Sequence, residues 1–151
     1  IFTSEDDFKN KVSNDFFLEH ALVHGNFYGT SKDFVETKIA EGINIILEID
    51  VQGVQQIKST NFPHESIFLL PPSIESLTER LNERGTNSKE SIELRLSNAM
   101  KEIPSCKDYD HILVNDVFED CCNDLARIIT GEDSFPMNSK KELFLTKLLN
   151  S

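Results

Sequence analysis

The chain of 151 residues is acidic, with a formal net charge of -11, so it lacks the basic surface that binding to nucleic acids or anionic membranes requires. Its hydrophobic content of 38% and charged content of 27% are those of a globular protein, and its length favours one domain with a sizeable core. No apolar run reaches the roughly 18 residues of a membrane span, and no signal peptide is recognisable.

Three cysteines occur, at Cys106, Cys121 and Cys122. An odd number with an adjacent pair is a poor disulfide framework, which indicates a reducing, cytosolic compartment. None of them has the spacing of metal ligands. We interpret Cys122 as a small core residue on the face of a helix.

The first elements are a short helix and a hairpin. Ser4 is expected to cap the helix, with acidic residues in its first turn and Phe8 on its inward face. Residues 16–23 alternate and predict a strand that turns at residues 25–26 into a second short strand. One side of the first strand would carry Phe17, Glu19, Ala21 and Val23.

The middle of the chain alternates between helices and apolar runs. Ser31 is expected to cap a helix that ends at Gly42. Residues 43–50 form a near-continuous apolar run that predicts a buried parallel strand, and residues 66–71 predict another. A helix carrying Val54 and Ile57 separates the two runs.

The second half of the chain continues this alternation. Ser73 is expected to cap a helix, Pro104 closes the next helix, and residues 111–116 predict a third buried strand. Gly131 ends a helix whose apolar stripe would be Phe118, Cys122, Leu125 and Ile129. A terminal helix is expected over residues 138–149. This order of elements predicts an α/β fold with a parallel sheet.

Polar residues follow two of the predicted strands, at the sheet edge where α/β proteins bind ligands. Asn115 and Asp116 are interpreted equally well as helix caps or as functional residues. For Glu48 and Asp50 we favour function, because neighbouring carboxylates repel each other unless a cation or ligand donors relieve them.

Arg80, Arg84 and Arg95 are candidates for binding an anion. Arg80 and Arg84 lie four residues apart on one helical face, and a shared anionic partner would offset their repulsion. The three guanidinium groups could close over a polyphosphate. Pairing with nearby acids remains an equal alternative, and the candidates are Glu79, Glu83 and Glu93.

Glu19 is unusual because it lies on the expected inward face of a strand, and a buried carboxylate needs a partner. One candidate is guanine, whose N1–H and N2 amino donors match the two oxygens of a carboxylate. The alternatives are a salt bridge or an exposed strand position. The nearby pair His20 and His24 does not have the order of the helical zinc motif, and the segment is a predicted strand, so we do not favour a metal site.

Several blocks occur in order and at the spacing found in guanylate kinases, and they cover nearly the whole chain. They are FLEHALVHGNFYGTS, IILEIDVQGVQQIK, IFLLPPS, LTERLNERGTNSKESIELRL and ILVND. The chain is therefore identified by resemblance as a member of that family. The resemblance implies transfer of the γ-phosphoryl group of ATP to GMP, with Mg²⁺, in the cytoplasm.

The resemblance also implies a three-layer P-loop kinase fold with a parallel core sheet. In that fold, residues 1–31 would be mostly a small GMP-binding subdomain and residues 73–104 a helical lid. Residues 32–72 and 105–151 would form the core, with a C-terminal helix at the end. The sequence leaves both a monomer and a homodimer open.

The resemblance assigns roles on the GMP side to several residues. Glu19 and Thr30 would bind guanine, and the Tyr28 hydroxyl would donate to the GMP phosphate. Gly25 and Gly29 would let the backbone approach the nucleotide closely.

Other roles concern the phosphates and the adenine. Asp50 would support Mg²⁺, and Glu48 would lie near GMP where relatives often carry Asp. Asn115 resembles a contact on the adenine side, with Asp116 a weaker candidate. The three arginines would neutralise the charge that develops on the transferred group; these are Arg80, Arg84 and Arg95.

One departure from the family pattern is large. The phosphate-binding motif Gly-x-x-Gly-x-Gly-Lys-Ser/Thr does not occur in these 151 residues, and the chain begins with Ile1. Without that motif the ATP phosphates have no backbone cradle, so we expect the chain alone not to catalyse efficiently. We expect the working protein to carry the segment with this motif.

Two alternatives to the kinase remain. One is a non-catalytic module that holds phosphorylated peptides, as some relatives do, although the arginines favour the enzyme. The other is a truncated product without function.

Overall fold

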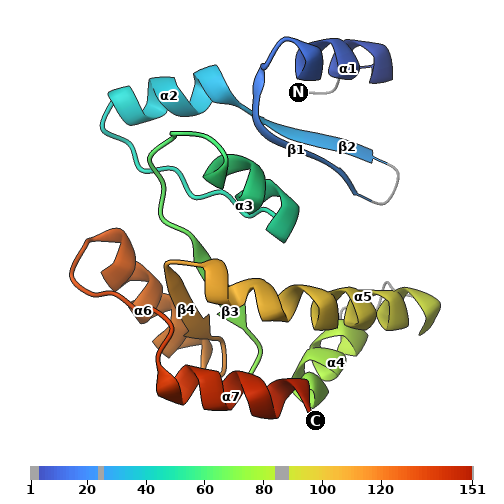
Figure 1. The fold of residues 1–151 in the computed structure, drawn as a ribbon, viewed down its shortest axis with the longest axis vertical. Helices are drawn as coiled ribbons and strands as arrows, with labels where there is room; N and C mark the ends of the chain where they lie inside the picture. Colours follow the sequence, from blue (N-terminus) through green and yellow to red (C-terminus); the bar gives the residue numbers. More distant parts are fainter. Residues whose placement is uncertain (1–3, 24–25, 84–88, 151) are drawn as a thin grey trace. The chain divides into compact units, whose positions relative to one another are not determined.

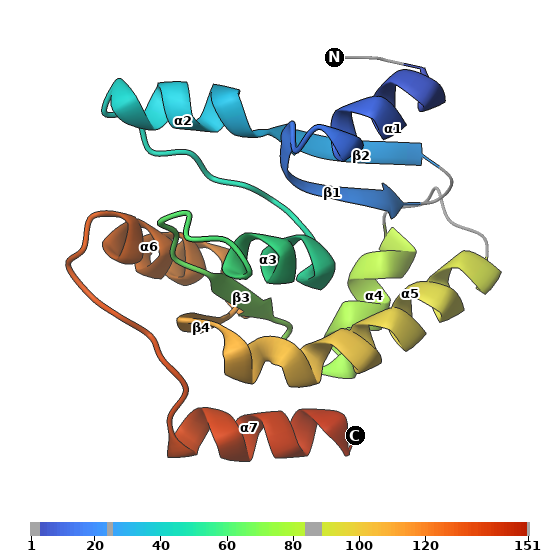
Figure 2. The same cartoon turned by 45° about the horizontal axis from the view of Figure 1, so that its top comes forward.

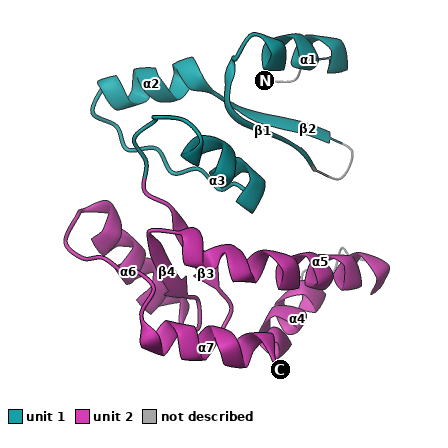
Figure 3. Ribbon diagram, viewed as in Figure 1, with its two compact units in different colours: residues 1–64 teal, residues 65–151 magenta. Residues whose placement is uncertain are grey.

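The computed structural model describes residues 4–23, 26–83 and 89–150. The chain divides into two compact units, residues 1–64 and 65–151, which are treated separately below (Figure 3). The first unit contains α1 (Glu5–Ser13), β1 (Phe17–Val23), β2 (Asn26–Ser31), α2 (Lys32–Ala40) and α3 (Val51–Lys58). The second contains β3 (Ile67–Leu70), α4 (Ile74–Glu83), α5 (Lys89–Glu102), the 3₁₀ helix η1 (Ile103–Asp108), β4 (His111–Val114), α6 (Phe118–Ile129) and α7 (Ser139–Leu149).

The predicted helix and hairpin at the start of the chain are confirmed. Ser4 caps α1 by accepting a hydrogen bond from the Asp7 backbone N–H. β1 and β2 pair antiparallel (Figure 1). The buried ring of Phe8 on α1 stacks on Phe17 and Phe27 of the hairpin, with ring centroids 4.7 and 5.0 Å away. These aromatic contacts hold α1 on one face of the hairpin.

The alternation predicted for β1 is broken by a β-bulge. Phe17 pairs with Ser31 and Glu19 pairs with Thr30, so Leu18 is an extra residue on β1. Leu18 and Glu19 are consecutive and both are buried, whereas Phe17 packs on α1. The prediction that Phe17 and Glu19 share a face is therefore wrong, because a bulge shifts the period-two pattern by one residue.

The predicted strand at residues 43–50 is not formed. The segment joins α2 to α3 without regular secondary structure, and Ile46 is 69% exposed. Leu47 and Ile49 still pack against a small cluster made by Leu18, Val35 and Ile57. A strand needs a neighbour to pair with, and no described residue pairs with this segment, so apolar content alone was misleading.

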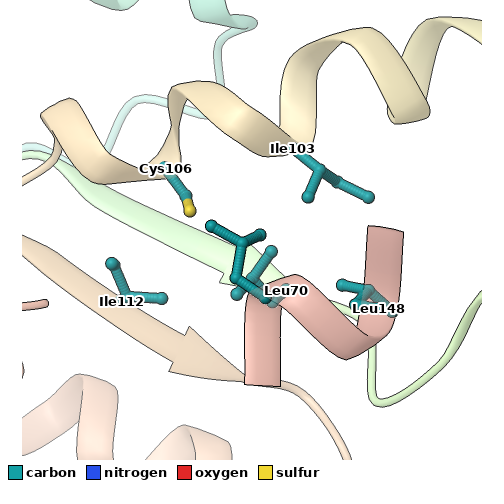
Figure 4. Close-up of a cluster of buried hydrophobic side chains, with 6 residues drawn as sticks. Leu70, Ile103, Cys106, Ile112 and Leu148 are labelled. Carbon is teal, nitrogen blue, oxygen red and sulfur yellow. The ribbon is translucent and has the colours of Figure 1, made fainter. Parts of the chain in front are cut away.

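The second unit is built on a parallel pair, β3 and β4, which confirms the strands predicted at residues 66–71 and 111–116. Both faces of the pair are covered, as in α/β folds. On one face, Leu70 and Ile112 pack against η1 and α7 through Ile103, Cys106, Leu145 and Leu148 (Figure 4). On the other face, Leu113 packs against Cys121 and Ile128 of α6. The three layers are visible in Figure 2.

Side chains reinforce the start of this parallel pair. Asp110 accepts hydrogen bonds from the backbone N–H and the hydroxyl of Ser66, at 2.9 and 2.6 Å. The hydroxyl of Ser66 in turn accepts a hydrogen bond from the Asp110 backbone N–H. The buried ring of His111 accepts a hydrogen bond from the Phe135 N–H at Nδ1, which places the ring proton on Nε2, facing Glu65.

The apolar face predicted for the helix at residues 118–129 is wrong, because a neighbouring face of the helix is the buried one. Phe118 is 73% exposed and Cys122 is exposed, whereas Cys121 and Ile128 are buried and Leu125 packs with them. Both candidate stripes contain Leu125, so helical periodicity does not distinguish them. The structure selects the stripe that faces Leu113 of β4.

The burial of the cysteines predicts their reactivity. Burial raises the pKa of the Cys106 and Cys121 thiols, so little of either is thiolate, the reactive form, near pH 8. We expect a colorimetric thiol reagent to modify Cys122 rapidly and the other two only after unfolding. Replacing Cys122 by serine is expected to abolish the rapid phase, and a rapid phase that persists in that variant would contradict the burial of Cys121.

No helix among the described residues is long and apolar enough to cross a membrane.

Candidate functional site

The residues predicted to bind a purine are brought together in the first unit. Glu19 on β1 is opposite Thr30 on β2, and the Thr30 hydroxyl donates a hydrogen bond of 2.5 Å to Glu19 Oε1. Tyr28 lies two residues from Thr30 on β2, opposite Ala21, and is 56% exposed. Alternate residues of a strand share a face, so Tyr28 and Thr30 are presented on one side of the hairpin.

Glu19 is 6% exposed, and its carboxylate has no ion pair within the described part of the chain. The two alternatives to ligand binding were a salt bridge and an exposed strand position. Neither is observed for Glu19 among the described residues. A carboxylate has about four lone-pair sites. The Thr30 hydroxyl uses one of them, which leaves acceptor capacity for a ligand with two donors.

Helix α3 lies against this carboxylate and contributes two residues that the sequence did not single out. A Cβ on Gly53 would be 3.0 Å from Glu19 Oε2, so Gly53 is where the helix approaches the acid most closely. Gln56 forms two hydrogen bonds with the backbone of His20, the residue after Glu19. An isolated glycine inside a helical pattern was a signal for the first. Nothing local marks Gln56, because its partner is 36 residues away.

The acids at the end of residues 43–50 have different environments. Asp50 caps α3, and its Oδ1 accepts a hydrogen bond of 2.8 Å from the Gly53 N–H. Glu48 is exposed. The capping role that we did not favour for Asp50 is thus present. Support of Mg²⁺ by Asp50 and a contact of Glu48 with GMP stay predictions.

Gly29 has a packing role. A Cβ on Gly29 would be 2.7 Å from Cδ1 of Phe17, so the absence of a side chain makes room for that ring. The positive backbone angle typical of tight glycine turns occurs at Gly42 and Gly131 instead, where α2 and α6 end. His20 is half-buried in β1, with its ring centroid 6.3 Å from that of Phe8. Gly25 and His24 lie outside the described residues.

In the second unit, Arg80 and Asn115 line an open pocket of about 280 Å³. Arg80 Nη1 donates a hydrogen bond of 2.9 Å to the backbone carbonyl of Asn115, and the Asn115 N–H donates to Leu70 at the end of β3. The remaining lining is apolar, from β3, α4 and the loop between them: Leu69, Leu70, Pro71, Leu77 and Leu81. The pocket thus combines apolar side chains with a few polar groups, which is the composition of small-molecule sites.

Arg95 on α5 has its Nε buried without a hydrogen-bond partner among the residues described. Within the same residues, neither Arg80 nor Arg95 forms an ion pair with an acid, so the alternative of pairing with Glu79, Glu83 or Glu93 is not observed for them. Arg84 lies outside the described residues. A buried guanidinium nitrogen without an acceptor is costly, so Arg95 has unused donor capacity.

The alternative of helix caps for Asn115 and Asp116 is not observed either. The N-terminal cap of α6 is Val117, and among the residues that the structure describes no side-chain hydrogen bond caps the start of that helix. Asn115 is half-buried beside the pocket, whereas Asp116 is exposed. The structure therefore favours Asn115 over Asp116 as a pocket residue.

Comparisons with known proteins identify the family of the chain. The family model described as guanylate kinase matches residues 1–132. The chain is 46% identical over 133 residues to the guanylate kinase of Escherichia coli (strain K12), a match that covers 87% of this chain and 64% of that protein. It is 40% identical over 150 residues to the guanylate kinase of Buchnera aphidicola subsp. Acyrthosiphon pisum, covering 98% of this chain and 72% of that protein.

A solved structure is also similar. The crystal structure of guanylate kinase from Anaplasma phagocytophilum superposes with a TM-score of 0.69 at 30% sequence identity. This match covers 98% of the chain described here and 73% of the solved chain. The chain thus has the α/β fold of that protein, and it spans just under two thirds of the length of the Escherichia coli relative.

Proposed function

Because this chain belongs to the guanylate kinase family, we propose that it functions in the transfer of the γ-phosphoryl group of ATP to GMP, which gives GDP and ADP. This makes it part of a transferase of purine nucleotide metabolism. Its substrates would be two nucleotides, with no role for nucleic acid or membrane. The acidic charge and the free cysteines support a cytoplasmic location. The protein would act as a monomer or a homodimer.

The pairing of Glu19 with Thr30 carries this proposal. A buried carboxylate that has no basic partner among the described residues is poised to accept the N1–H and N2 amino donors of guanine, and adenine presents no such pair of donors. The Thr30 hydroxyl fixes the carboxylate before the ligand arrives, which lowers the ordering cost of binding. The exposed hydroxyl of Tyr28 would donate to the phosphate of GMP.

The arginines would act on the transferred group. Arg95, with its unused donor, and Arg80, anchored on Asn115, would place guanidinium groups against developing phosphate charge. We propose the same role for Arg84. The assignment of residues 73–104 to a lid, and of residues 1–31 to the GMP-binding part, stays a prediction of the family resemblance.

Asp50 would support Mg²⁺ when the nucleotides are bound. The described residues contain no group of three or more His, Cys, Asp or Glu side chains that could hold a metal ion. Mg²⁺ fits one carboxylate together with water and substrate phosphates, which is the binding that Asp50 could supply. The ion would neutralise phosphate charge.

The direct test is equilibrium binding by calorimetry, because it does not require turnover by these 151 residues. GMP is expected to bind at least about tenfold more tightly than AMP, since only GMP uses both oxygens of Glu19. Equal affinities, or no binding of either nucleotide, would contradict the proposed function.

A second prediction concerns Arg80 in the active protein. Replacing Arg80 by alanine is expected to lower kcat about tenfold, with a smaller rise in the KM for GMP, because the charge it would neutralise develops in the transition state. The matched control is Arg127→Ala, since Arg127 on α6 is paired with Asp124 and Asp133. A loss confined to KM would make Arg80 a binding residue only.

A further inference from the structure

Glu19 lies at a point of β1 where the strand is not held by β2 alone. The bulge at Leu18 lets two consecutive side chains face α3. Leu18 packs with Ile57 of α3, and Glu19 lies beside Gly53 of the same helix. The position of the carboxylate therefore depends on how β1 is held on α3.

Gln56 makes that connection through the backbone. Its Oε1 accepts a hydrogen bond of 3.1 Å from the His20 N–H, and its Nε2 donates one of 2.8 Å to the His20 carbonyl. The His20 pairing partner on β2 is Gly29, and both backbone groups of His20 are used by the glutamine. The primary amide thus takes the place of a neighbouring strand at one residue, directly after Glu19.

Gly53 sets the distance between the helix and the acid. A Cβ at this position would lie 3.0 Å from Glu19 Oε2 and 3.2 Å from the Cβ of Ile49. Both distances are tighter than ordinary contacts, and Ile49 is part of the packed cluster, so it yields less readily than the carboxylate. A side chain at Gly53 would displace Glu19 Oε2.

We propose that α3 positions Glu19 for reading guanine, with Gln56 as the positioning residue and Gly53 as the residue that leaves space for Oε2. This inference rests on the proposed function, because it concerns how the same carboxylate meets its ligand. Thr30 holds Oε1 from β2, and α3 controls the backbone and Oε2. With Oε1 fixed by Thr30 and room for Oε2 beside Gly53, the carboxylate can meet two donors at once, which discriminates better than a single contact.

Comparing GMP with IMP isolates this effect, because IMP lacks the N2 amino group and offers only the N1–H donor. Removing the amide of Gln56 should shift the carboxylate of Glu19. The contact with the N2 amino group should then weaken more than the contact with the N1–H. The ratio of the two affinities is therefore a readout that a general loss of stability does not change.

The variants are Gln56→Met, which keeps the length of the side chain without its hydrogen bonds, and Gln56→Ala. The matched control is Gln55→Ala, since Gln55 is the adjacent residue of α3 and is exposed. By calorimetry, we expect the affinity for GMP to fall about threefold to tenfold in both Gln56 variants, with a smaller loss for IMP. The Gln55 variant should match the unaltered protein.

Gly53→Ala independently tests whether Gly53 leaves the space that Glu19 Oε2 needs. Alanine favours a helix over glycine, so α3 itself should not be weakened. We expect the affinity for GMP to fall about threefold or more, because the added Cβ would displace Glu19 Oε2, although alanine raises the helix propensity of α3.

The outcomes are distinct. An unaltered GMP-to-IMP ratio in the Gln56 variants, or equal losses for both nucleotides together with a lower melting temperature, would overturn the positioning role. Tight GMP binding by Gly53→Ala would overturn the role of Gly53. If the unaltered protein fails to prefer GMP over AMP, the proposed function fails instead.

Discussion

Replacing Glu19 by glutamine is expected to weaken GMP binding by about 1–3 kcal/mol, which corresponds to roughly 5- to 150-fold in affinity. The substitution keeps the shape of the side chain but turns one acceptor into an NH₂ donor. Because guanine would use both oxygens of the carboxylate, the new NH₂ faces a donor of guanine in either orientation, whereas the Thr30 hydroxyl can turn to accept from it. In either orientation one hydrogen bond is replaced by a clash of donors.

The measurement is the affinity for GMP and for AMP in the same titration series. AMP should be little affected, because it does not use the paired acceptors, so the preference for GMP should collapse. The control is Glu36→Gln, an exposed acid of α2 in the same unit. Unchanged selectivity in the Glu19 variant would remove this residue from guanine recognition.

The second large effect is expected in the core of the other unit. Leu145→Ala should lower the free energy of unfolding by about 2–5 kcal/mol, because a buried leucine loses its contacts and leaves a cavity. Leu145 is 2% exposed and packs with Leu70, Ile112 and Leu148, which fixes α7 on the β3–β4 pair of its own unit.

Chemical denaturation followed by circular dichroism measures this change. The matched control is Leu143→Ala on the same helix, since Leu143 is 58% exposed and should change stability by less than about 0.5 kcal/mol. Equal effects of the two substitutions would mean that α7 does not pack on the sheet in the way described.

Local signals in the sequence predicted most element boundaries. The caps Ser4, Ser31 and Ser73 all accept the expected backbone hydrogen bonds, because the geometry of a cap involves only neighbouring residues. Gly42 and Gly131 end helices with positive backbone angles for the same local reason. The parallel pairing of β3 with β4 followed from their continuous apolar runs.

Predictions that depended on tertiary partners were less successful. Residues 43–50 have the composition of a strand but no described strand beside them. The face of α6 was misassigned because two apolar stripes overlap at Leu125 and only packing on Leu113 distinguishes them. The motif also led to Glu19, Thr30 and Tyr28, which lie together on the hairpin, and their binding roles stay predictions.

The contacts that α3 makes with β1 beside Glu19 could not be predicted from sequence motifs. The hydrogen bonds of Gln56 to His20 join residues far apart in the chain, and no pattern in one sequence reports such a contact.

The bulge in β1 lets two consecutive residues point to the same side of the strand, which a regular strand does not allow. Leu18 enters the apolar cluster and Glu19, the next residue, faces Thr30, although strict alternation would turn one of them away. A deletion of Leu18 would join Phe17 directly to Glu19 and leave both on their present faces. The same deletion would remove the contact of Leu18 with Ile57 of α3, so the bulge is the point where the length of the strand and the placement of Glu19 on α3 are coupled.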